Sequence, residues 1–240
     1  MSIENFIERV SVRDFDKKPM SKKDIKIITE VINNSPTSMN IQQFSAIIIT
    51  DQKIKKWIGE MNYNQQHIID SAAFILFVTD RTRIRHIIKN QKLNQDIAFA
   101  ELRRTVVDTT IAATYAHDAF IEMGYGVTFV GGVVGFAEQL EKKLDLPKTT
   151  SVIVGLSVGK ATKHNALKPK MNKVFINKYN KTDTLKEVIK YDKEHSEYLR
   201  KIQNGNNYGE LIKSLYSVNR YAKGLEGMGQ YVNKKIKEFK

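Results

Sequence analysis

Two groups of cationic and hydroxyl side chains, far apart in the chain, have types that suit an anionic phosphate. Arg9, Ser11 and Arg13 stand at alternate positions near the start, and Lys168–Lys170 reads Lys-Pro-Lys much later. A guanidinium can grip two phosphate oxygens at once, and an ammonium adds a compact charge. Taken alone, each group is an ordinary solvated turn or basic loop. Together they predict one phosphate site built from distant parts of the sequence.

Amide and hydroxyl side chains form a second set, which suits a ribityl chain and a pyrimidine edge because these groups both donate and accept hydrogen bonds. An ordinary polar loop is the competing interpretation of its first part. Gln65 is the further amide, with Gln66 as the alternative one residue along. The loop members of the set are Thr37, Ser38, Asn40 and Gln42.

The third set is the segment Phe129, Val130, Gly131, Gly132, which ends an expected strand. The simplest explanation of the two glycines is that the turn after the strand needs flexible residues. Glycines also let a backbone approach a flat ring closely. With the cations and amides, these residue types could hold one flavin mononucleotide (FMN).

In this order and spacing the motifs resemble the FMN-dependent nitroreductase and flavin reductase family. The likeness is to the branch with the oxygen-insensitive NADPH nitroreductase and the NADPH-flavin oxidoreductase, and it runs from about Ile3 to about Lys178. It implies bound FMN, with NADPH or NADH as co-substrate. It also implies ping-pong hydride transfer to nitroaromatics, quinones or free flavin, with no catalytic side chain because the cofactor carries the chemistry.

The resemblance also implies individual roles. Arg9, Ser11, Arg13, Lys168 and Lys170 would bind the FMN phosphate, and Gln65 the pyrimidine edge. The loop at 37–42 would reach the flavin from the other subunit. The backbone of 129–132, with the N–H of Gly131, would approach flavin N5.

Three departures from the branch pattern bear on these roles. The branch has histidine where Arg9 stands and arginine where Lys170 stands, so the charge is kept while the contact geometry changes. Its NADPH-preferring members carry an arginine where Tyr208 and Gly209 stand here. Lys201 or Lys213 could substitute, so the choice between NADPH and NADH stays open.

The fold class predicted is α+β and nitroreductase-like, with a central, mostly antiparallel sheet surrounded by helices. The resemblance implies a domain-swapped homodimer. Residues 1–180 are expected to form the FMN-binding domain. Residues 181–240 are expected to form a helical extension that packs on the partner or covers the flavin.

Hydrophobic patterning predicts the individual elements. The segment 106–119 is small-sided and apolar, which predicts a helix buried on several faces, with His117 as a core or interface residue. Helices are expected at 3–10, from Ser21 to before Pro36, and at 54–61, 67–71, 96–123 and 136–144, and strands at 44–50, 73–79, 127–130, 150–158 and, briefly, 174–177.

The net charge of +13 raises a rival from another class, a basic nucleic-acid-binding protein without flavin. The cations are spread along the chain, however, and the clusters at 53–56, 81–85 and 234–237 read as solvated helix faces or ends. We therefore expect no nucleic-acid partner. A flavin-dependent dehalogenase or a low-turnover FMN-holding relative is the rival within the enzyme class.

Several other classes are not indicated. There is no cysteine, and the five histidines have no metal-ligand spacing, so no metal is expected. Neither a Gly-x-x-x-x-Gly-Lys-Ser/Thr loop nor a Gly-x-Gly-x-x-Gly motif occurs. The apolar run 72–78 is too short to cross a bilayer, and the first residues do not resemble a secretory signal. A cytoplasmic location without membrane partners is expected.

Overall fold

The computed structural model describes residues 3–89, 93–163, 165–198, 207–217 and 219–239. The chain divides into two compact units, one of Met1–Asn165 with Met228–Lys240 and the other of Ala166–Gly227. The sequence placed a boundary at 180 and assigned everything after it to the extension. In the structure the chain from Met228 onward belongs to the first unit, where Tyr231 and Lys235 are buried.

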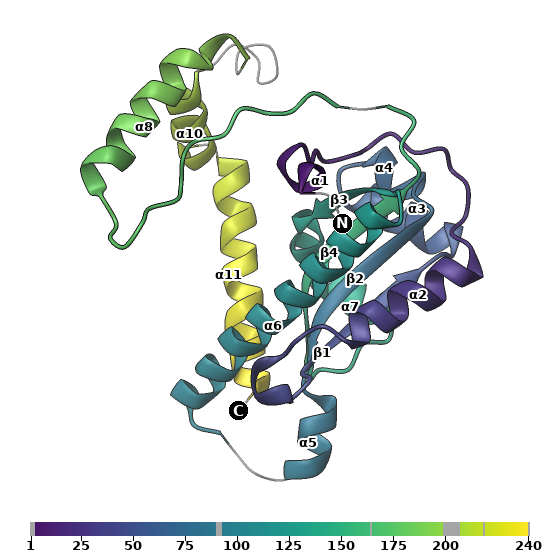
Figure 1. Cartoon of the computed structure of the whole chain (residues 1–240). Helices are drawn as coiled ribbons and strands as arrows, with labels where there is room; N and C mark the ends of the chain where they lie inside the picture. Colours follow the sequence, from purple (N-terminus) through teal and green to yellow (C-terminus); the bar gives the residue numbers. More distant parts are fainter. Residues whose placement is uncertain (1–2, 90–92, 164, 199–206, 218, 240) are drawn as a thin grey trace. The chain divides into compact units, whose positions relative to one another are not determined.

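The first unit is built on a four-stranded sheet in the order β1-β2-β4-β3 (Figure 1). All three strand pairings are antiparallel, which confirms the predicted sheet type. Every residue of β2 is buried, because both faces of this central strand are covered. The strands are β1 (Phe44–Ile49), β2 (Ala73–Asp80), β3 (Gly126–Val130) and β4 (Thr150–Gly159).

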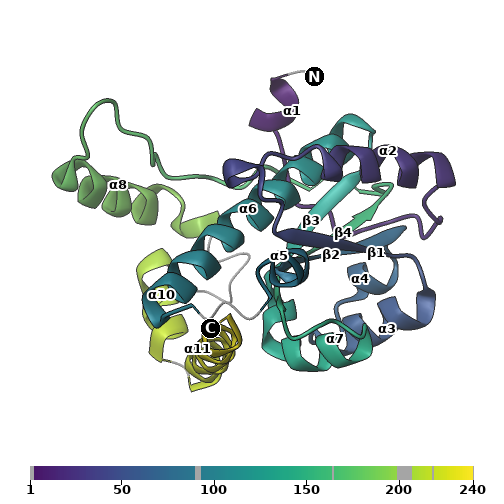
Figure 2. The ribbon, with the colours of Figure 1, turned by 90° about the horizontal axis from the view of Figure 1, so that it is seen from below.

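Helices cover both faces of this sheet (Figure 2). Ile75 and Phe77 of β2 pack in the cluster with α2 and α6, while the alternate Phe74 and Leu76 pack in the cluster with α3, α4 and α7. The helices of this unit are α1 (Glu4–Ile7), α2 (Lys22–Asn33), α3 (Gln52–Met61), α4 (Gln66–Ile69), α5 (Thr82–Ile88), α6 (Gln95–Glu122), α7 (Ala137–Lys143) and the end of α11 (Asn219–Phe239), with 3-10 turns η1 (Ser38–Asn40) and η2 (Gly131–Phe136).

Local capping fixes where the principal helices begin and end. The Ser21 hydroxyl accepts from the Asp24 backbone N–H at 3.0 Å, which confirms the helix start read from the sequence. Asn94 caps α6 in the same way, accepting from the Ile97 N–H at 2.9 Å. Gly124, with φ +72°, ends α6 in the left-handed conformation that glycine adopts without strain. The chain then turns directly into β3.

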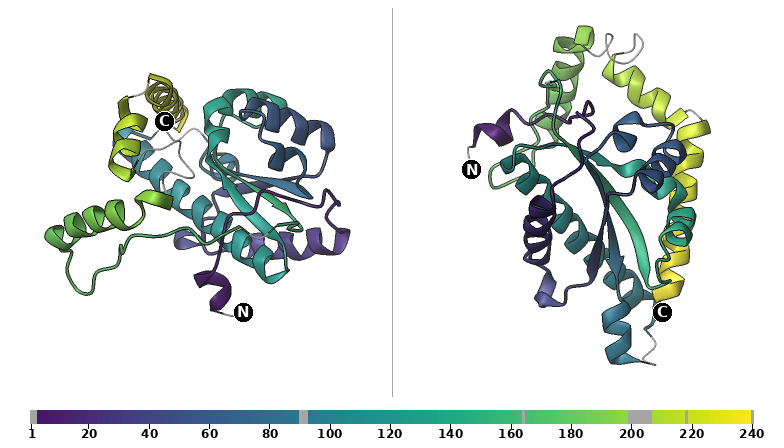
Figure 3. Two further views of the ribbon diagram at one scale, coloured as in Figure 1. Left: turned by 90° about the horizontal axis from the view of Figure 1, so that it is seen from above. Right: turned by 90° about the vertical axis from the view of Figure 1, so that its right-hand side faces the viewer.

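One cation in each predicted surface cluster is buried, which corrects the reading of those clusters as wholly solvated. Lys55, Arg81 and Lys235 are at most 4% exposed. The Lys235 Nζ lies 2.8 Å from Glu141 Oε1 and 3.0 Å from Glu238 Oε2, and so joins the end of α11 to α7, beside which Figure 3 shows it. Helix periodicity alone does not reveal which member of a cationic run turns inward onto a carboxylate or carbonyl.

The second unit contains helices α8 (Lys181–Glu194) and α10 (Tyr208–Ser217), with the first residues of α11. The Tyr191 ring holds it together, edge-on to Tyr208 at 5.4 Å and packed on His195 at 4.9 Å. The strand predicted at 174–177 is not formed, because no strand within the described part of the chain pairs with it. None of the helices that the structure describes is both long and apolar enough to span a bilayer.

Candidate functional site

The N-terminal cations are positioned by a segment that runs along the β3 edge of the sheet. The Val12 N–H donates to the Val127 carbonyl at 3.1 Å, and Phe15 forms a β-bridge with Ala161. Glycine makes room for both side chains. A Cβ on Gly126 would lie 2.6 Å from Val12, and one on Gly159 would lie 2.8 Å from Phe15.

Burial of Val12 and Phe15 determines where Arg13 points. Successive side chains of an extended segment face opposite ways, so Arg13 is exposed while Val12 is in the core. Arg9 and Ser11 are half-buried on the same stretch. The Ser11 carbonyl accepts from Asn165 Nδ2 at 2.8 Å, which holds the end of this unit to the cationic segment.

Gln65 lies against the buried side chains of Asn62 and His67, and Gly132 lies against Asn62; we call these four residues the turn cluster. Gln65 Oε1 lies 2.8 Å from His67 Nε2 and 3.0 Å from Asn62 Nδ2. Asn62 Oδ1, which is buried and has no hydrogen-bond partner, would be 2.2 Å from a Cβ on Gly132. The turn after β3 therefore rests directly on the side chain that holds Gln65.

Electrostatics connect Arg13 to the turn cluster. Burial, together with the positive charge of Arg13, lowers the pKa of His67 to about 4. His67 is therefore neutral at physiological pH. Through His67 and Asn62, the residues Arg13, Gln65 and Gly132, which the sequence assigned to one ligand, belong to one neighbourhood.

Phe129 and Val130 take different places in this neighbourhood. The Phe129 ring stacks on His117 with centroids 5.0 Å apart, and the Val130 side chain is buried in the core, so Val130 can offer a ligand only its backbone. His117 is a core residue, one of the two outcomes predicted. Burial lowers its pKa, the contact with Asp118 opposes that shift, and the charge of Arg9 adds to it.

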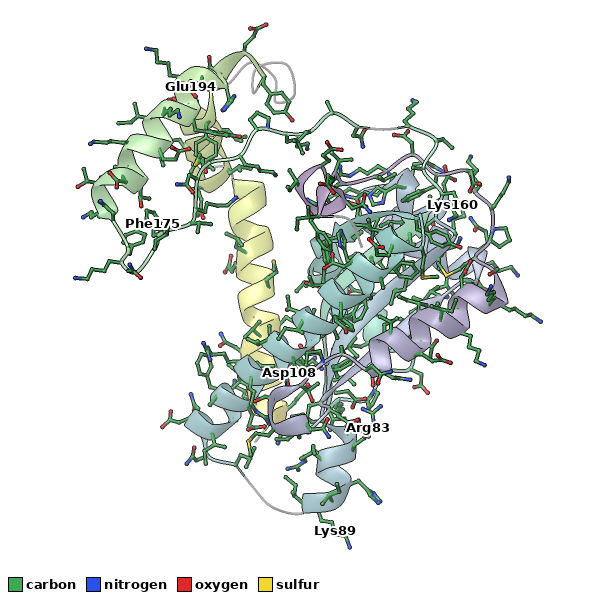
Figure 4. The ribbon with its side chains drawn as sticks, in the orientation of Figure 1. Arg83, Lys89, Asp108, Lys160, Phe175 and Glu194 are labelled. Carbon is green, nitrogen blue, oxygen red and sulfur yellow. The ribbon has the colours of Figure 1, made fainter. Side chains whose placement is uncertain are left out.

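The residues at 37–42, which we call the edge loop, lie at the other side of the sheet. The Ser38 N–H donates to Asp108 Oδ1 of α6 at 3.1 Å (Figure 4), and the Gln42 N–H donates to Thr37 Oγ1 at 3.1 Å. Met39, Asn40 and Gln42 have φ between 54° and 59°. Residues other than glycine rarely adopt this left-handed backbone conformation, so contacts around the loop must hold it there.

The fold therefore separates the predicted residues into two groups. The edge loop leads into β1 and the turn cluster lies at the end of β3, and these strands are the two edges of the sheet. Three inter-strand steps of about 4.8 Å put them roughly 14 Å apart across the sheet, before any offset along the strands. Within one chain the edge loop does not join Arg13, Gln65 and Gly131.

Lys168 and Lys170 belong to the second unit. There the Tyr191 hydroxyl donates to the Pro169 carbonyl at 3.3 Å, which ties the Lys-Pro-Lys segment to α8. Of the two lysines suggested for a nucleotide phosphate, Lys213 pairs with Glu210 at 3.0 Å, and Lys201 lies outside the described residues. In the part of the chain that the structure describes, no three His, Asp or Glu residues gather as a metal site requires.

The sequence did not single out the residues that hold the candidate groups in place. Asn62, His67 and Ser157 support Gln65, and Asp108 supports the edge loop. His67 and Asn62 lie two and three residues from Gln65, so these two contacts are local along the chain. The contacts of Ser157 with His67 and of Asp108 with Ser38 depend on which elements meet in three dimensions.

Comparison with known proteins agrees with this geometry. Residues 7–160 match the family described as "Nitroreductase family". The chain is 27% identical to the FMN reductase [NAD(P)H] of Bacillus subtilis over 224 residues, covering 89% of this chain and 90% of the relative. It is 29% identical to a Staphylococcus aureus NADPH-dependent oxidoreductase over 206 residues, covering 82% of each.

Solved structures share the fold. The hypothetical oxidoreductase YcnD from Bacillus subtilis superposes with a TM-score of 0.84 at 26% identity, over 96% of this chain and 98% of that one. The matched segment 7–160 contains the cationic segment, the edge loop, the turn cluster and all four strands. The chain therefore belongs to the nitroreductase family.

Proposed function

We propose that this chain is an FMN-dependent NAD(P)H oxidoreductase that passes two electrons to nitroaromatics, quinones or free flavin. The observation that carries the proposal is that Gln65 bonds both to His67, which is buried, neutral and close enough to feel the charge of Arg13, and to Asn62, on which the Gly132 turn rests. The names of the relatives, an FMN reductase [NAD(P)H] and an NADPH-dependent oxidoreductase, support the same chemistry.

The residues present fit FMN. Arg13 and Arg9 would bind its phosphate with Ser11, and the resemblance adds Lys168 and Lys170 as further cations. Gln65 would bind the pyrimidine edge. A Cβ on Gly131 would meet no atom within 4 Å, so the backbone there is open to a flat ring. The bound flavin would supply the hydride chemistry, accepting from NADH or NADPH and then passing the electrons on by ping-pong turnover.

A homodimer is part of the proposal, because it would unite the two separated groups. Helix α6 buries one face against the sheet but leaves Val107, Ile111 and Tyr115 between 39% and 48% exposed. The prediction that this helix is buried on several faces is thus not met within one chain. An apolar groove of about 400 Å³ follows these residues. A second copy would cover it and bring its edge loop to the flavin.

Strand exchange between the copies would complete the domain-swapped arrangement expected from the sequence. Strand β1 is an edge of the sheet, and a cavity of about 740 Å³ runs beside Phe44, Ala46 and Ile48. An exposed strand edge offers unpaired N–H and C=O groups. The segment 174–177, whose Val174 and Ile176 are more than three-quarters exposed, is the proposed occupant from the partner. The role of 181–240 over the partner or flavin, and the cytoplasmic location, stay predictions.

The visible spectrum of the purified protein tests the proposal most directly. We expect flavin absorption bands, release of FMN on denaturation, and oxidation of NADH or NADPH with nitrofurazone, menadione or FMN as acceptor. Comparing the two nucleotides settles the preference. A colourless protein that takes up no added FMN and is retained on DNA in a salt-dependent way would overturn the proposal in favour of the nucleic-acid-binding alternative.

Charge reversal at Arg13 refines the test. Since a charged hydrogen bond contributes about 1.5–3 kcal/mol, Arg13→Glu should weaken FMN binding by about tenfold to about 150-fold. Lys26→Glu, the same change on an exposed face of α2, is the control and should leave FMN binding unchanged. Equal FMN affinity in the two variants would contradict the phosphate site.

A further inference from the structure

Behind Gln65 lies a row of buried polar groups that the proposed chemistry does not by itself require. Ser157 Oγ of β4 lies 3.1 Å from His67 Nδ1, and His67 Nε2 lies 2.8 Å from Gln65 Oε1. Ser157, His67 and Asn62 are all at most 8% exposed, whereas Gln65 is half-buried. The row thus runs outward from the sheet to the one side chain that can face a ligand.

The hydrogen bonds of this row have a single direction. A carboxamide oxygen can only accept, so His67 Nε2 must carry a hydrogen to bond Gln65 Oε1. In the neutral ring Nδ1 is then unprotonated and accepts from the Ser157 hydroxyl. The row therefore reads Ser157 to His67 to Gln65, with each group donating to the next.

This direction fixes what Gln65 can offer. Its oxygen already accepts from His67 and from Asn62, which uses both of its lone pairs. Across the residues that the structure describes, no acceptor lies within hydrogen-bond distance of its NH₂ group. The side chain is thus locked with its oxygen inward, and it can present only N–H donors outward.

We propose that His67 is a positioning residue, which as the neutral Nε2–H tautomer keeps the Gln65 carboxamide turned so that its NH₂ donates to the acceptor edge of the flavin pyrimidine. The inference rests on the proposed function. Reduction by two electrons places negative charge on that edge, and a fixed donor stabilises the charged form more than the neutral one. His67 thereby favours the reduced flavin without touching it.

The first test needs no flavin. The ¹⁵N shifts of histidine-labelled apoprotein report which ring nitrogen carries hydrogen, and the His67→Phe variant assigns the signals. We expect the neutral Nε2–H form of His67 between pH 5.5 and 8. An Nδ1–H tautomer, or a doubly protonated ring at pH 7, would overturn the inference whether or not the protein binds FMN.

The second test compares the affinities of the protein for reduced and oxidised FMN, obtained from the midpoint potential of the bound flavin. His67→Phe and Gln65→Glu should each lower the preference for reduced flavin about tenfold, which for a two-electron couple is about 30 mV. Gln65→Glu changes a half-buried side chain in place, so it decides the question even where His67→Phe fails to fold.

Gln66→Glu is the matched control, since it makes the same change one residue along on an exposed side chain. It should leave the preference unchanged. A shift in Gln66→Glu with none in Gln65→Glu, or an unchanged preference in folded His67→Phe, would overturn the inference. Absence of FMN binding in the wild-type protein would instead refute the proposed function, and the tautomer result would still stand.

Discussion

The turn cluster and the edge loop contribute to the same proposed site but are supported in opposite ways. The turn cluster rests on side chains from the turn between α3 and α4, from α4 and from β4, most of them buried, and each is fixed by at least one other. The edge loop has left-handed residues and one long-range hydrogen bond, from Ser38 to Asp108. A single chain thus preorganises the turn cluster, whereas the edge loop would contribute to the proposed site only after a second copy has bound.

The largest expected effect tests whether a second copy joins the two halves. Ile111→Glu would place a charge in the α6 groove and should abolish the dimer, because desolvating an unpaired carboxylate costs several kcal/mol. FMN retention should be lost with the dimer. Sedimentation velocity measures the first and absorbance the second.

Ala100→Glu is the control for this change, on the same helix but outside the groove, and should remain a dimer. If Ile111→Glu were still a dimer, the α6 groove would not be part of the dimer interface. A wild-type monomer that retains FMN stoichiometrically would show that one chain binds FMN without the partner's edge loop. The edge loop would then not be the second half of the site.

Acid should weaken the turn cluster specifically. The pKa of His67 is about 4 in the folded protein and near 6.5 in the unfolded chain, so between these values the unfolded state binds more protons. Stability is therefore full above pH 6.5 and falls as the pH drops to 4, by about 3 kcal/mol from this group. Urea unfolding of apoprotein at several pH values measures it. The free energy of unfolding of His67→Phe should fall by about 3 kcal/mol less over this pH range. Equal pH dependence in the variant and the wild type would refute the lowered pKa of His67.

The adjacent glycines offer a matched pair within the turn. Gly132→Ala would press a Cβ against the buried Asn62 and should destabilise the fold by about 2 kcal/mol, whereas Gly131→Ala has open space and should change stability by less than about 0.5 kcal/mol. Thermal unfolding compares them. Gly131→Ala should nevertheless weaken FMN binding if the backbone approaches the ring. Equal stability of the two variants would mean that the turn does not rest on Asn62.

The smallest effect concerns the edge loop. Asp108→Ala removes the acceptor of the Ser38 N–H and should cost about 1 kcal/mol locally, seen as amide exchange at Ser38 that is roughly five- to tenfold faster. Asp108→Asn keeps an acceptor oxygen at the same place and should exchange like the wild type. Unchanged exchange in Asp108→Ala would show that the loop is held by other contacts.

The sequence by itself determined the family-level architecture. Alternating and continuous apolar runs located all four strands of the sheet, and local capping signals such as Ser21 with Asp24 fixed helix starts, because these patterns depend only on neighbours along the chain. It also supplied the residue types for a flavin site.

Only the tertiary structure decided how those residues are arranged. The sequence could not show that Ser157 meets His67, that Asn62 lies against Gly132, that Asp108 holds Ser38, or that Lys235 leaves a cationic run to pair with Glu141. It gave no sign that the edge loop and the turn cluster lie at opposite edges of the sheet. Each of these facts depends on which distant segments meet, and hydrogen bonds between distant segments leave no periodic trace in the order of residues.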